Sequence, residues 1–326
     1  MKEEDIRKRE VFNQYLTLVE KDVEKLFNNA SSYVQINCPA CSSVAYKQEF
    51  IKTGFNYVSC NKCHTLFVNP RPTFKDLMKF YAESESTGYW IREFFTPVAE
   101  VRREKMFKPR AEYVISILPE KKDGLIGDIG AGFGIFLEEL KLIWPDANLV
   151  AIEPSDEQAA LCEEKGFTVL HCALEEVTGY DQQFDLLSSF EVFEHLFDPH
   201  TFLEHIFLLL KPGGSFYMTT LNGEGFDIQI FWEESKSINP PLHLNFFNPE
   251  SIELLFKRCG FKDIKVTTPG KLDWDIVEGM LNKEGFTTER FWHLLADKGS
   301  DSCKQELQQW LTKNNLSSHM KVIASK

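Results

Sequence analysis

The sequence lacks any apolar run that approaches the roughly 20 residues needed to span a bilayer. Its N-terminus, Met1 to Asp5, is mostly charged and is not followed by the apolar core of a signal peptide. The chain also contains neither an internal repeat nor a low-complexity tract. These absences argue against a membrane protein and against a repeat architecture, and they predict a cytoplasmic protein with no membrane contact.

Positive charge is scarce as well, with 36 Lys and Arg against 49 Asp and Glu and a net charge of −13. The negative net charge argues against general electrostatic binding to nucleic acid or anionic membranes. Residues 1–100 are balanced, with 13 basic and 13 acidic side chains, so the acidity lies in the remainder. A length of 326 residues allows one large core plus a small appended module.

The eight cysteines fall into two groups. Cys38, Cys41, Cys60 and Cys63 form two C-x2-C pairs with 18 residues between them, whereas the other four are scattered singly. Each C-x2-C turn presents two thiolates, and two such turns complete a tetrahedral zinc shell. Four protein ligands leave no open position, so we predict a structural zinc ion. The alternative is four unligated thiols.

The cysteine pairs lie in a short module that we place at residues 36–72. Alternating segments at 46–50 and 55–59, separated by Thr53-Gly54, predict small β-hairpins. Apolar spacing over residues 5–29 predicts an amphipathic helix, which either packs on its own chain or forms a homodimer contact. The predicted regions are therefore an N-terminal helical region (1–35), a zinc module (36–72) and a large domain (73–326).

From residue 123 onward, strand and helix patterns alternate. Predicted strands cover 124–129, 148–152, 167–170, 185–190, 214–220, 262–268 and 320–324. Predicted helices cover 134–143, 156–165, 199–210 and 249–258. This alternation predicts an α/β domain with a seven-stranded, mostly parallel sheet covered on both faces. A helical insertion at about 273–316 precedes the last strand.

A glycine-rich turn, Asp128 to Gly134, follows the first of these strands and opens into a helix at Ile135. Glycines there let the backbone pass close to a ligand, and the helix start adds unpaired N–H groups. The third glycine comes one residue too early for the dinucleotide pattern G-x-G-x-x-G. An acid two residues before the first glycine suits a cationic amino group and not a pyrophosphate.

Two more motifs follow in order. The second strand ends in Glu153, 19 residues past Gly134, where a carboxylate can accept both hydroxyls of an adenosine ribose. The alternative is a surface glutamate that starts a loop. Lys211 to Gly214 forms a K-P-G-G turn before the fifth strand. Over roughly residues 110–270, these motifs resemble class I S-adenosylmethionine-dependent methyltransferases.

The resemblance implies a Rossmann-like fold with S-adenosylmethionine as cofactor. It assigns cofactor contacts to Asp128, Gly130, Gly132, Glu153, Ala173 and Leu174. Asp128 and the glycines would line the methionine end, Glu153 would hold the ribose, and the segment after the third strand would flank the adenine. Glu191, at the end of the fourth strand, would face the transferred methyl group.

A narrower resemblance concerns the N-terminal part. The stretch from Cys60 to Pro72, together with Phe80-Tyr81 and with Thr268 to Asp273, resembles zinc-ribbon-bearing methyltransferases of bacterial sugar and surface-glycan modification. This likeness implies a small-molecule acceptor, most simply a sugar or nucleotide sugar.

The segment Glu191-x-x-Glu194-His195 has two interpretations. Positions i, i+3 and i+4 share one helical face, and two carboxylates with a histidine can bind Mg²⁺. Quinone-pathway O-methyltransferases have a similar pattern. Metal-free relatives also carry Glu-His here, with the histidine near the methyl-transfer centre. We predict that turnover needs no divalent cation.

His243 lies between Pro240-Pro241 and an aromatic run, in the long loop after the fifth strand. Loops at that end of a parallel sheet face the ligand crevice. An acceptor hydroxyl or acidic carbon must lose a proton, and histidine has a suitable pKa. We predict His243 as general base, with His195 as its rival. The alternative is a buried, hydrogen-bonded structural histidine.

The sequence thus predicts a zinc-ribbon-bearing class I methyltransferase that acts on a small metabolite. An RNA base methyltransferase is one alternative, and the absence of a basic cluster in residues 1–100 counts against it. A quinone-like, metal-dependent O-methyltransferase is another. A non-catalytic zinc-ribbon interaction protein with a relic cofactor fold is the third, and the intact glycines and Glu153 count against it.

Overall fold

The computed structural model describes residues 2–27, 32–118 and 124–326, which form two compact units. Unit 1 comprises Met1–Val98, Leu221–Ile252 and Thr267–Met320. Unit 2 comprises Ala99–Thr220, Glu253–Val266 and Lys321–Lys326. The domain boundaries given above stay predictions. Within the described ranges, no helix is both long and apolar enough to cross a membrane.

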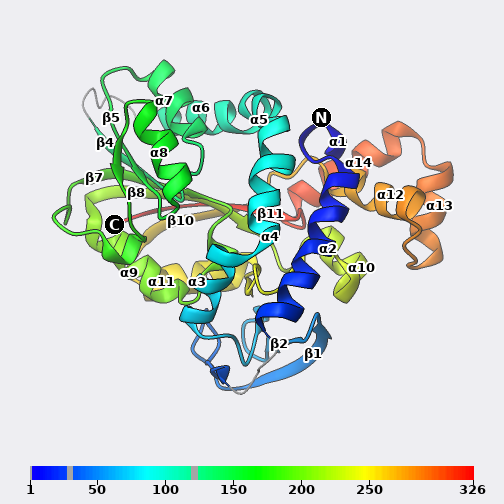
Figure 1. Ribbon diagram of the computed structural model, residues 1–326. Coiled ribbons are helices and arrows are strands. Elements are labelled where there is room, and N and C mark those ends of the chain that lie inside the picture. The colour runs from blue at the N-terminus through cyan, green and yellow to red at the C-terminus, as the bar shows by residue number, and fades with distance from the viewer. Residues whose placement is uncertain (1, 28–31, 119–123) are drawn as a thin grey trace. The chain divides into compact units, whose positions relative to one another are not determined.

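Unit 2 is built on a seven-stranded sheet in the order β10-β11-β8-β7-β4-β5-β6 (Figure 1). Its strands are β4 (Leu125–Ile129), β5 (Asn148–Ile152), β6 (Thr168–Leu170), β7 (Phe184–Phe190), β8 (Leu210–Leu221), β10 (Lys262–Thr267) and β11 (His319–Ser325). The five strands from β6 to β8 pair in parallel. The predicted seven-stranded, mostly parallel sheet is therefore confirmed.

Helices cover both faces of this sheet because side chains alternate along each strand. The helices of unit 2 are α5 (Ala99–Arg102), α6 (Lys108–Ile117), α7 (Ile135–Ile143), α8 (Asp156–Glu164), α9 (Pro199–Leu209) and the part of α11 (Pro249–Arg258) from Glu253 onward. On one face, Tyr217 of β8 joins a core with residues of α6, α7 and α8. Its neighbour Phe216 points the other way and stacks on Phe256 of α11, 5.9 Å between ring centroids.

The strand order reverses at β4, which has β5 on one side and β7 on the other. The carboxyl ends of these three parallel strands therefore lie at one edge of the sheet. In open α/β sheets, ligands bind outside the carboxyl ends of the strands at such a switch point. The chain segments that leave those ends begin at Gly130, Glu153 and Glu191.

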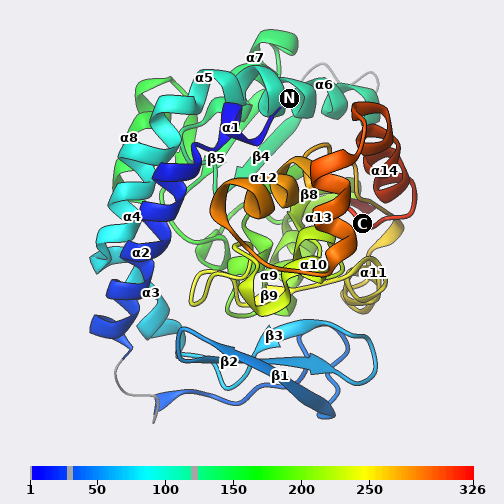
Figure 2. The ribbon, with the colours of Figure 1, turned by 90° about the vertical axis from the view of Figure 1, so that its right-hand side faces the viewer.

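Unit 1 contains a four-stranded sheet in the order β1-β2-β3-β9 (Figure 2). Its strands are β1 (Tyr46–Lys52), β2 (Phe55–Cys60), β3 (Leu66–Val68) and β9 (Asn245–Phe246). The predicted hairpin around Thr53-Gly54 is confirmed as the antiparallel pair of β1 and β2. The prediction missed β9, which comes from a distant part of the chain and extends the sheet beyond β3.

The predicted N-terminal helix is divided into α1 (Glu3–Ile6) and α2 (Arg9–Leu26), since Arg7 and Lys8 take extended dihedrals. Residues 28 and 29 of that prediction lie outside the described residues. The apolar side of α2 packs within its own chain: Tyr15 lies against Trp90, with 4.8 Å between ring centroids. A homodimer contact stays a prediction.

The other helices of unit 1 are α3 (Phe74–Glu83), α4 (Glu85–Tyr89), α10 (Phe226–Phe231), α12 (Asp273–Glu284), α13 (Arg290–Lys298) and α14 (Asp301–Lys313). A π-helical segment, Trp90–Phe95, follows α4. The predicted helical insertion near 273–316 is present as α12, α13 and α14, which share an apolar core with α10.

Candidate functional site

The glycine turn after β4 needs its glycines for backbone reasons. Gly130, Gly132 and Gly134 have positive φ angles of 67°, 54° and 67°. Residues other than glycine rarely adopt such angles. A Cβ atom at Gly130 would lie only 2.8 Å from Val192 Cγ2. The nearest atom to a Cβ at Gly132 would be 3.9 Å away, so this backbone is open to a close-lying ligand. The helix α7 begins directly after the turn.

Asp128, the acid before the glycines, is 3% exposed at the end of β4. Its Oδ1 accepts a hydrogen bond of 2.8 Å from the Ser188 hydroxyl on the neighbouring strand β7. Burial raises the pKa of Asp128 to about 7, against the lowering effects of the Ser188 hydrogen bond and the Arg110 charge. A cationic group placed beside this carboxyl would favour its ionised form.

Glu153 leaves the end of β5 and joins the glycine turn. Its Oε2 accepts from the Gly132 N–H at 2.8 Å, and its Oε1 accepts from the Ser155 N–H at 3.0 Å. The side chain is 4% exposed, and burial raises its pKa. Each carboxylate oxygen has a second lone pair, so both can still accept from a ligand hydroxyl. The surface-loop interpretation of Glu153 is therefore wrong.

The segment after β6 forms a short 3₁₀ turn, Leu174–Glu176. The Ala173 N–H donates to Glu176 Oε2 at 3.1 Å, and Leu174 is buried. Because β6 lies next to β5 in the sheet, this turn and Glu153 follow neighbouring strand ends.

Glu191, at the end of β7, has a φ of 58°, a strained conformation for a residue with a side chain. Its Oε1 accepts from the Thr219 hydroxyl at 2.6 Å and from Arg110 Nη2 at 3.3 Å. The Arg110 guanidinium also lies over the Phe190 ring, 4.5 Å from its centroid. Sequence reasoning missed Arg110, because no motif marks it on α6.

Glu194 and His195 follow in a 3₁₀ turn, Phe193–His195. Glu194 is 2% exposed and accepts from the Thr220 hydroxyl at 2.8 Å. Burial, and then the charge of Glu191, raises the pKa of Glu194 to about 8. Without a neighbouring cation, burial therefore favours the protonated form of this carboxyl.

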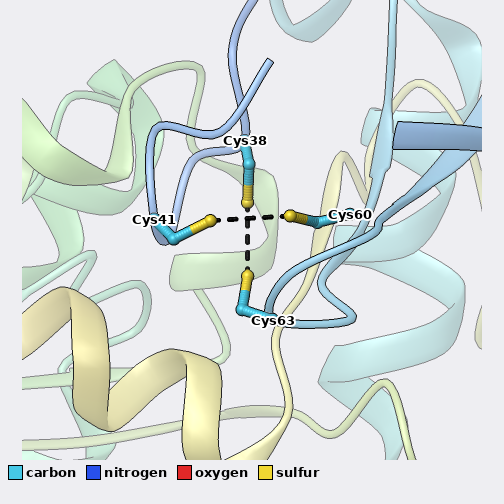
Figure 3. A group of neighbouring side chains, drawn as sticks. All are labelled: Cys38, Cys41, Cys60 and Cys63. Atoms are coloured by element: carbon cyan, nitrogen blue, oxygen red, sulfur yellow. Dashed lines mark hydrogen bonds between the residues drawn. The ribbon is translucent and has the colours of Figure 1, made fainter. Parts of the chain in front are cut away.

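The four cysteines of the two C-x2-C pairs converge in unit 1, and their sulfur atoms point toward one centre (Figure 3). All four Sγ atoms lie within 4.8 Å of one another, and the Cys38–Cys63 and Cys41–Cys60 pairs are each 3.5 Å apart. Zinc–thiolate bonds of about 2.3 Å require sulfur separations of roughly 3.8 Å. The donor set and its spacing therefore fit a tetrahedral zinc ion.

His243 belongs to unit 1, where its ring is held by a backbone carbonyl. Its Nδ1 lies 2.6 Å from the Ser237 carbonyl oxygen. A carbonyl can only accept, so Nδ1 carries the proton, and Nε2 of the neutral ring carries the lone pair. The Ser237 hydroxyl donates to Asp227 Oδ2 at 2.6 Å, and this second hydrogen bond holds Ser237 in place. Asp227 is 1% exposed.

The fold is Rossmann-like, and the residues predicted to contact a cofactor lie at or after the ends of its parallel strands. A family model described as a methyltransferase domain matches residues 99–266, just over half of the chain. The chain belongs to this family. Its domain over residues 99–266 is of the S-adenosylmethionine-dependent methyltransferase class, which agrees with the predicted cofactor.

Two of the relatives found by sequence are named ubiquinone biosynthesis O-methyltransferases. The chain is 33% identical over 149 residues to the mitochondrial ubiquinone biosynthesis O-methyltransferase of Homo sapiens, covering 41% of this chain and 40% of the relative. It is 32% identical over 147 residues to the ubiquinone biosynthesis O-methyltransferase of Methylococcus capsulatus, covering 43% and 61%. These matches span less than two thirds of either relative.

A solved structure supports the fold. Phosphoethanolamine N-methyltransferase 2 of Haemonchus contortus, in complex with S-adenosyl-L-methionine, superposes with a TM-score of 0.51 at 18% identity. The superposition covers 80% of this chain and 62% of that one. At this identity the likeness concerns the fold alone.

Proposed function

We propose that this enzyme transfers a methyl group from S-adenosylmethionine to a small metabolite, with a sugar or nucleotide sugar as the first candidate. The observation that carries the cofactor part is the buried Glu153 carboxylate joined to the Gly132 N–H. The sugar class is supported by the likeness of the N-terminal module to sugar-modifying enzymes, and the net charge of −13 counts against a nucleic acid acceptor. The ubiquinone-pathway relatives favour a quinone-like phenol as the second candidate.

Labelled S-adenosylmethionine tests the acceptor class directly. The purified protein is incubated with a panel of nucleotide sugars, a panel of hydroxylated benzoates and a transfer RNA transcript. We expect label in a nucleotide sugar. Label in the phenols alone would select the quinone-like alternative, and label in the transcript would select the RNA alternative.

The cofactor contacts follow from the charges at the strand ends. Asp128 would hold the amino group of the methionine moiety, and the Arg110 guanidinium offers a partner for its carboxylate. Glu153 would accept both ribose hydroxyls, while Ala173 and Leu174 would flank the adenine. Support comes from the placement of Asp128 and Glu153 at the carboxyl ends of the adjacent parallel strands β4 and β5.

His243 would act as the acceptor base. S-adenosylmethionine supplies an electrophilic methyl group on a sulfonium. Nε2 of His243 would take the proton from the acceptor hydroxyl, so that the oxygen lone pair forms the new C–O bond as the C–S electron pair returns to sulfur. Glu191, bonded to Thr219 and Arg110, would face the methyl group. The Nδ1–Ser237 hydrogen bond supports this role because it fixes the orientation of the ring and places the proton of the neutral ring on Nδ1.

Cofactor binding should depend on pH through Asp128. With a pKa of about 7 in the free protein, this carboxyl is protonated at lower pH and must release its proton to pair with an ammonium group. Affinity should therefore fall by about tenfold for each pH unit below about 7 and level off above it. Calorimetry near pH 6, in two buffers of different ionisation enthalpy, should show proton release. Asp128→Asn should bind weakly at every pH, and a parent protein with no proton release would contradict the assignment.

We propose that Cys38, Cys41, Cys60 and Cys63 bind one structural zinc ion. Elemental analysis should find about one zinc per chain in the parent protein and almost none in Cys60→Ser. Cys303→Ser, which alters an exposed cysteine outside the cluster, is the matched control and should keep its zinc. Cofactor affinity should stay largely intact in both variants. Full zinc in Cys60→Ser would refute this ligand set.

Turnover should need no added divalent cation. The expectation rests on the motif Glu191-x-x-Glu194-His195, which also occurs in metal-free relatives. We expect full activity after EDTA treatment once zinc has been restored. Activity that returns only with Mg²⁺ would overturn this prediction and favour the quinone-like alternative.

The cytoplasmic location and the homodimer contact predicted from the sequence stay proposals. Sedimentation equilibrium tests the dimer, because a single species of 37.7 kDa would contradict it.

A further inference from the structure

We propose that the cysteine module positions the loop of residues 232–248, here called the acceptor loop, so that zinc binding controls the placement of His243. This inference rests on the proposed role of His243 and adds a task for the zinc site. Both segments belong to unit 1. The structure joins them by backbone pairing, by buried side chains and by a contact at the cysteine turn itself.

The backbone contact comes first. Strand β3 of the module pairs antiparallel with β9 of the acceptor loop, with Leu66 opposite Phe246 and Phe67 opposite Asn245 (Figure 2). The Val68 N–H also donates to the Leu244 carbonyl at 2.9 Å. A two-residue strand is far too short to be stable alone, so the order of β9 depends on the strand beside it.

Buried side chains add to this pairing. The Tyr57 hydroxyl on β2 donates to the His243 carbonyl at 2.8 Å, and Tyr57 is fully buried. Arg71, also fully buried, donates to Asn245 Oδ1 at 2.9 Å. From β1, Lys52 donates to the Ser235 carbonyl at 2.8 Å. The module thus contacts the acceptor loop at His243, the proposed general base, and at Ser235 and Asn245 on either side of it.

The cysteine turn makes its own contact. Asn248 Nδ2 donates to the carbonyl of Cys63 at 3.0 Å. Cys60 and Cys63 form the turn that joins β2 to β3, the two strands that reach His243 and β9. A metal bound at this turn would restrain the ends of both strands, since two of its ligands come from the same short connection. Metal at the four thiolates would therefore fix the strands that hold the acceptor loop.

Hydrogen exchange on the full chain tests this coupling without using activity. We compare zinc-loaded protein with protein stripped of zinc by a chelator. Amides of residues 237–248 should exchange faster by about tenfold or more without zinc, whereas peptides from β4, β5 and β7 should be unchanged. Equal protection of residues 237–248 in both forms would overturn the proposal. A rise throughout the chain would do so too, since zinc would then stabilise the whole fold.

Tyr57→Phe tests the positioning step while leaving the cysteines in place. It removes one hydroxyl donor to the His243 carbonyl and keeps the buried ring. We expect about one zinc per chain, parent-like cofactor affinity, a turnover number about tenfold lower, and a displaced acidic limb of the pH profile. Tyr46→Phe on β1 is the matched control and should behave as the parent. Parent-like turnover and pH profile in Tyr57→Phe would contradict the inference.

The two experiments separate this inference from the proposed function. If His243→Ala keeps parent turnover, His243 is not the base, yet the exchange result still shows whether zinc orders the acceptor loop. If His243→Ala is inactive but amide exchange at residues 237–248 is the same with and without zinc, His243 remains the base and the positioning role of zinc is wrong.

Discussion

Glu153→Ala is expected to weaken S-adenosylmethionine binding by about 100-fold or more. Hydrogen bonds to a charged group contribute about 1.5–3 kcal/mol each, and this carboxylate would make two of them to the ribose. The alanine also releases the Gly132 N–H, which donates to Glu153 at 2.8 Å and holds the glycine turn against β5. Isothermal titration calorimetry measures the effect.

The matched control is Glu157→Ala, which removes an exposed glutamate four residues further along, in the first turn of α8. It should bind the cofactor as the parent does. Glu153→Gln keeps the side-chain shape and one carbonyl acceptor, so its affinity should fall between those of the parent and the alanine variant. Parent-like affinity in Glu153→Ala, with a parent-like melting temperature, would remove Glu153 from the site.

His243→Ala should lower the turnover number by about 100-fold or more and leave cofactor affinity nearly unchanged. General-base catalysis typically contributes a factor of about 10²–10⁴, and the lone pair of His243 sits on Nε2 because Nδ1 is bound to the Ser237 carbonyl. Single-turnover assays with labelled cofactor measure the methyl-transfer step itself.

His195→Ala is the comparison that names the base. The acidic limb of the pH profile should vanish in the variant that lacks the base and persist in the other. Loss of the limb in His195→Ala alone would transfer the role to His195. If both variants keep the parent profile, neither histidine takes the proton, and the acceptor is a group that ionises without help.

The sheet of unit 2 was predictable because its elements repeat a regular pattern. The strands β4, β5 and β7 are short, mostly buried runs, and the helices between strands carry apolar residues at helical spacing. The predicted bounds differ from the observed ones by a few residues at the ends; the fifth strand, for example, begins at Leu210 instead of residue 214. The cysteine cluster was also predictable, since the spacing of the two C-x2-C pairs implies four converging thiols. In the structure their sulfur atoms lie within 4.8 Å of one another.

Several features of the site could not be predicted, because they arise from contacts between distant residues. Arg110 meets Glu191 across 81 residues, and Tyr57 meets the His243 carbonyl across 186 residues. The strand β9 has two residues and no periodicity to detect. The raised pKa of Asp128 follows from its burial in the sheet, and its contact with Ser188 depends on the register of β4 and β7.

The central claim is that Glu153 and the glycine turn hold the nucleoside of S-adenosylmethionine. A structure of the protein with S-adenosylhomocysteine bound tests it most directly. We predict both ribose hydroxyls within about 3 Å of the Glu153 carboxylate oxygens, with the adenine beside Ala173 and Leu174. A nucleoside bound away from Glu153, or ribose hydroxyls that face no carboxylate, would contradict the account.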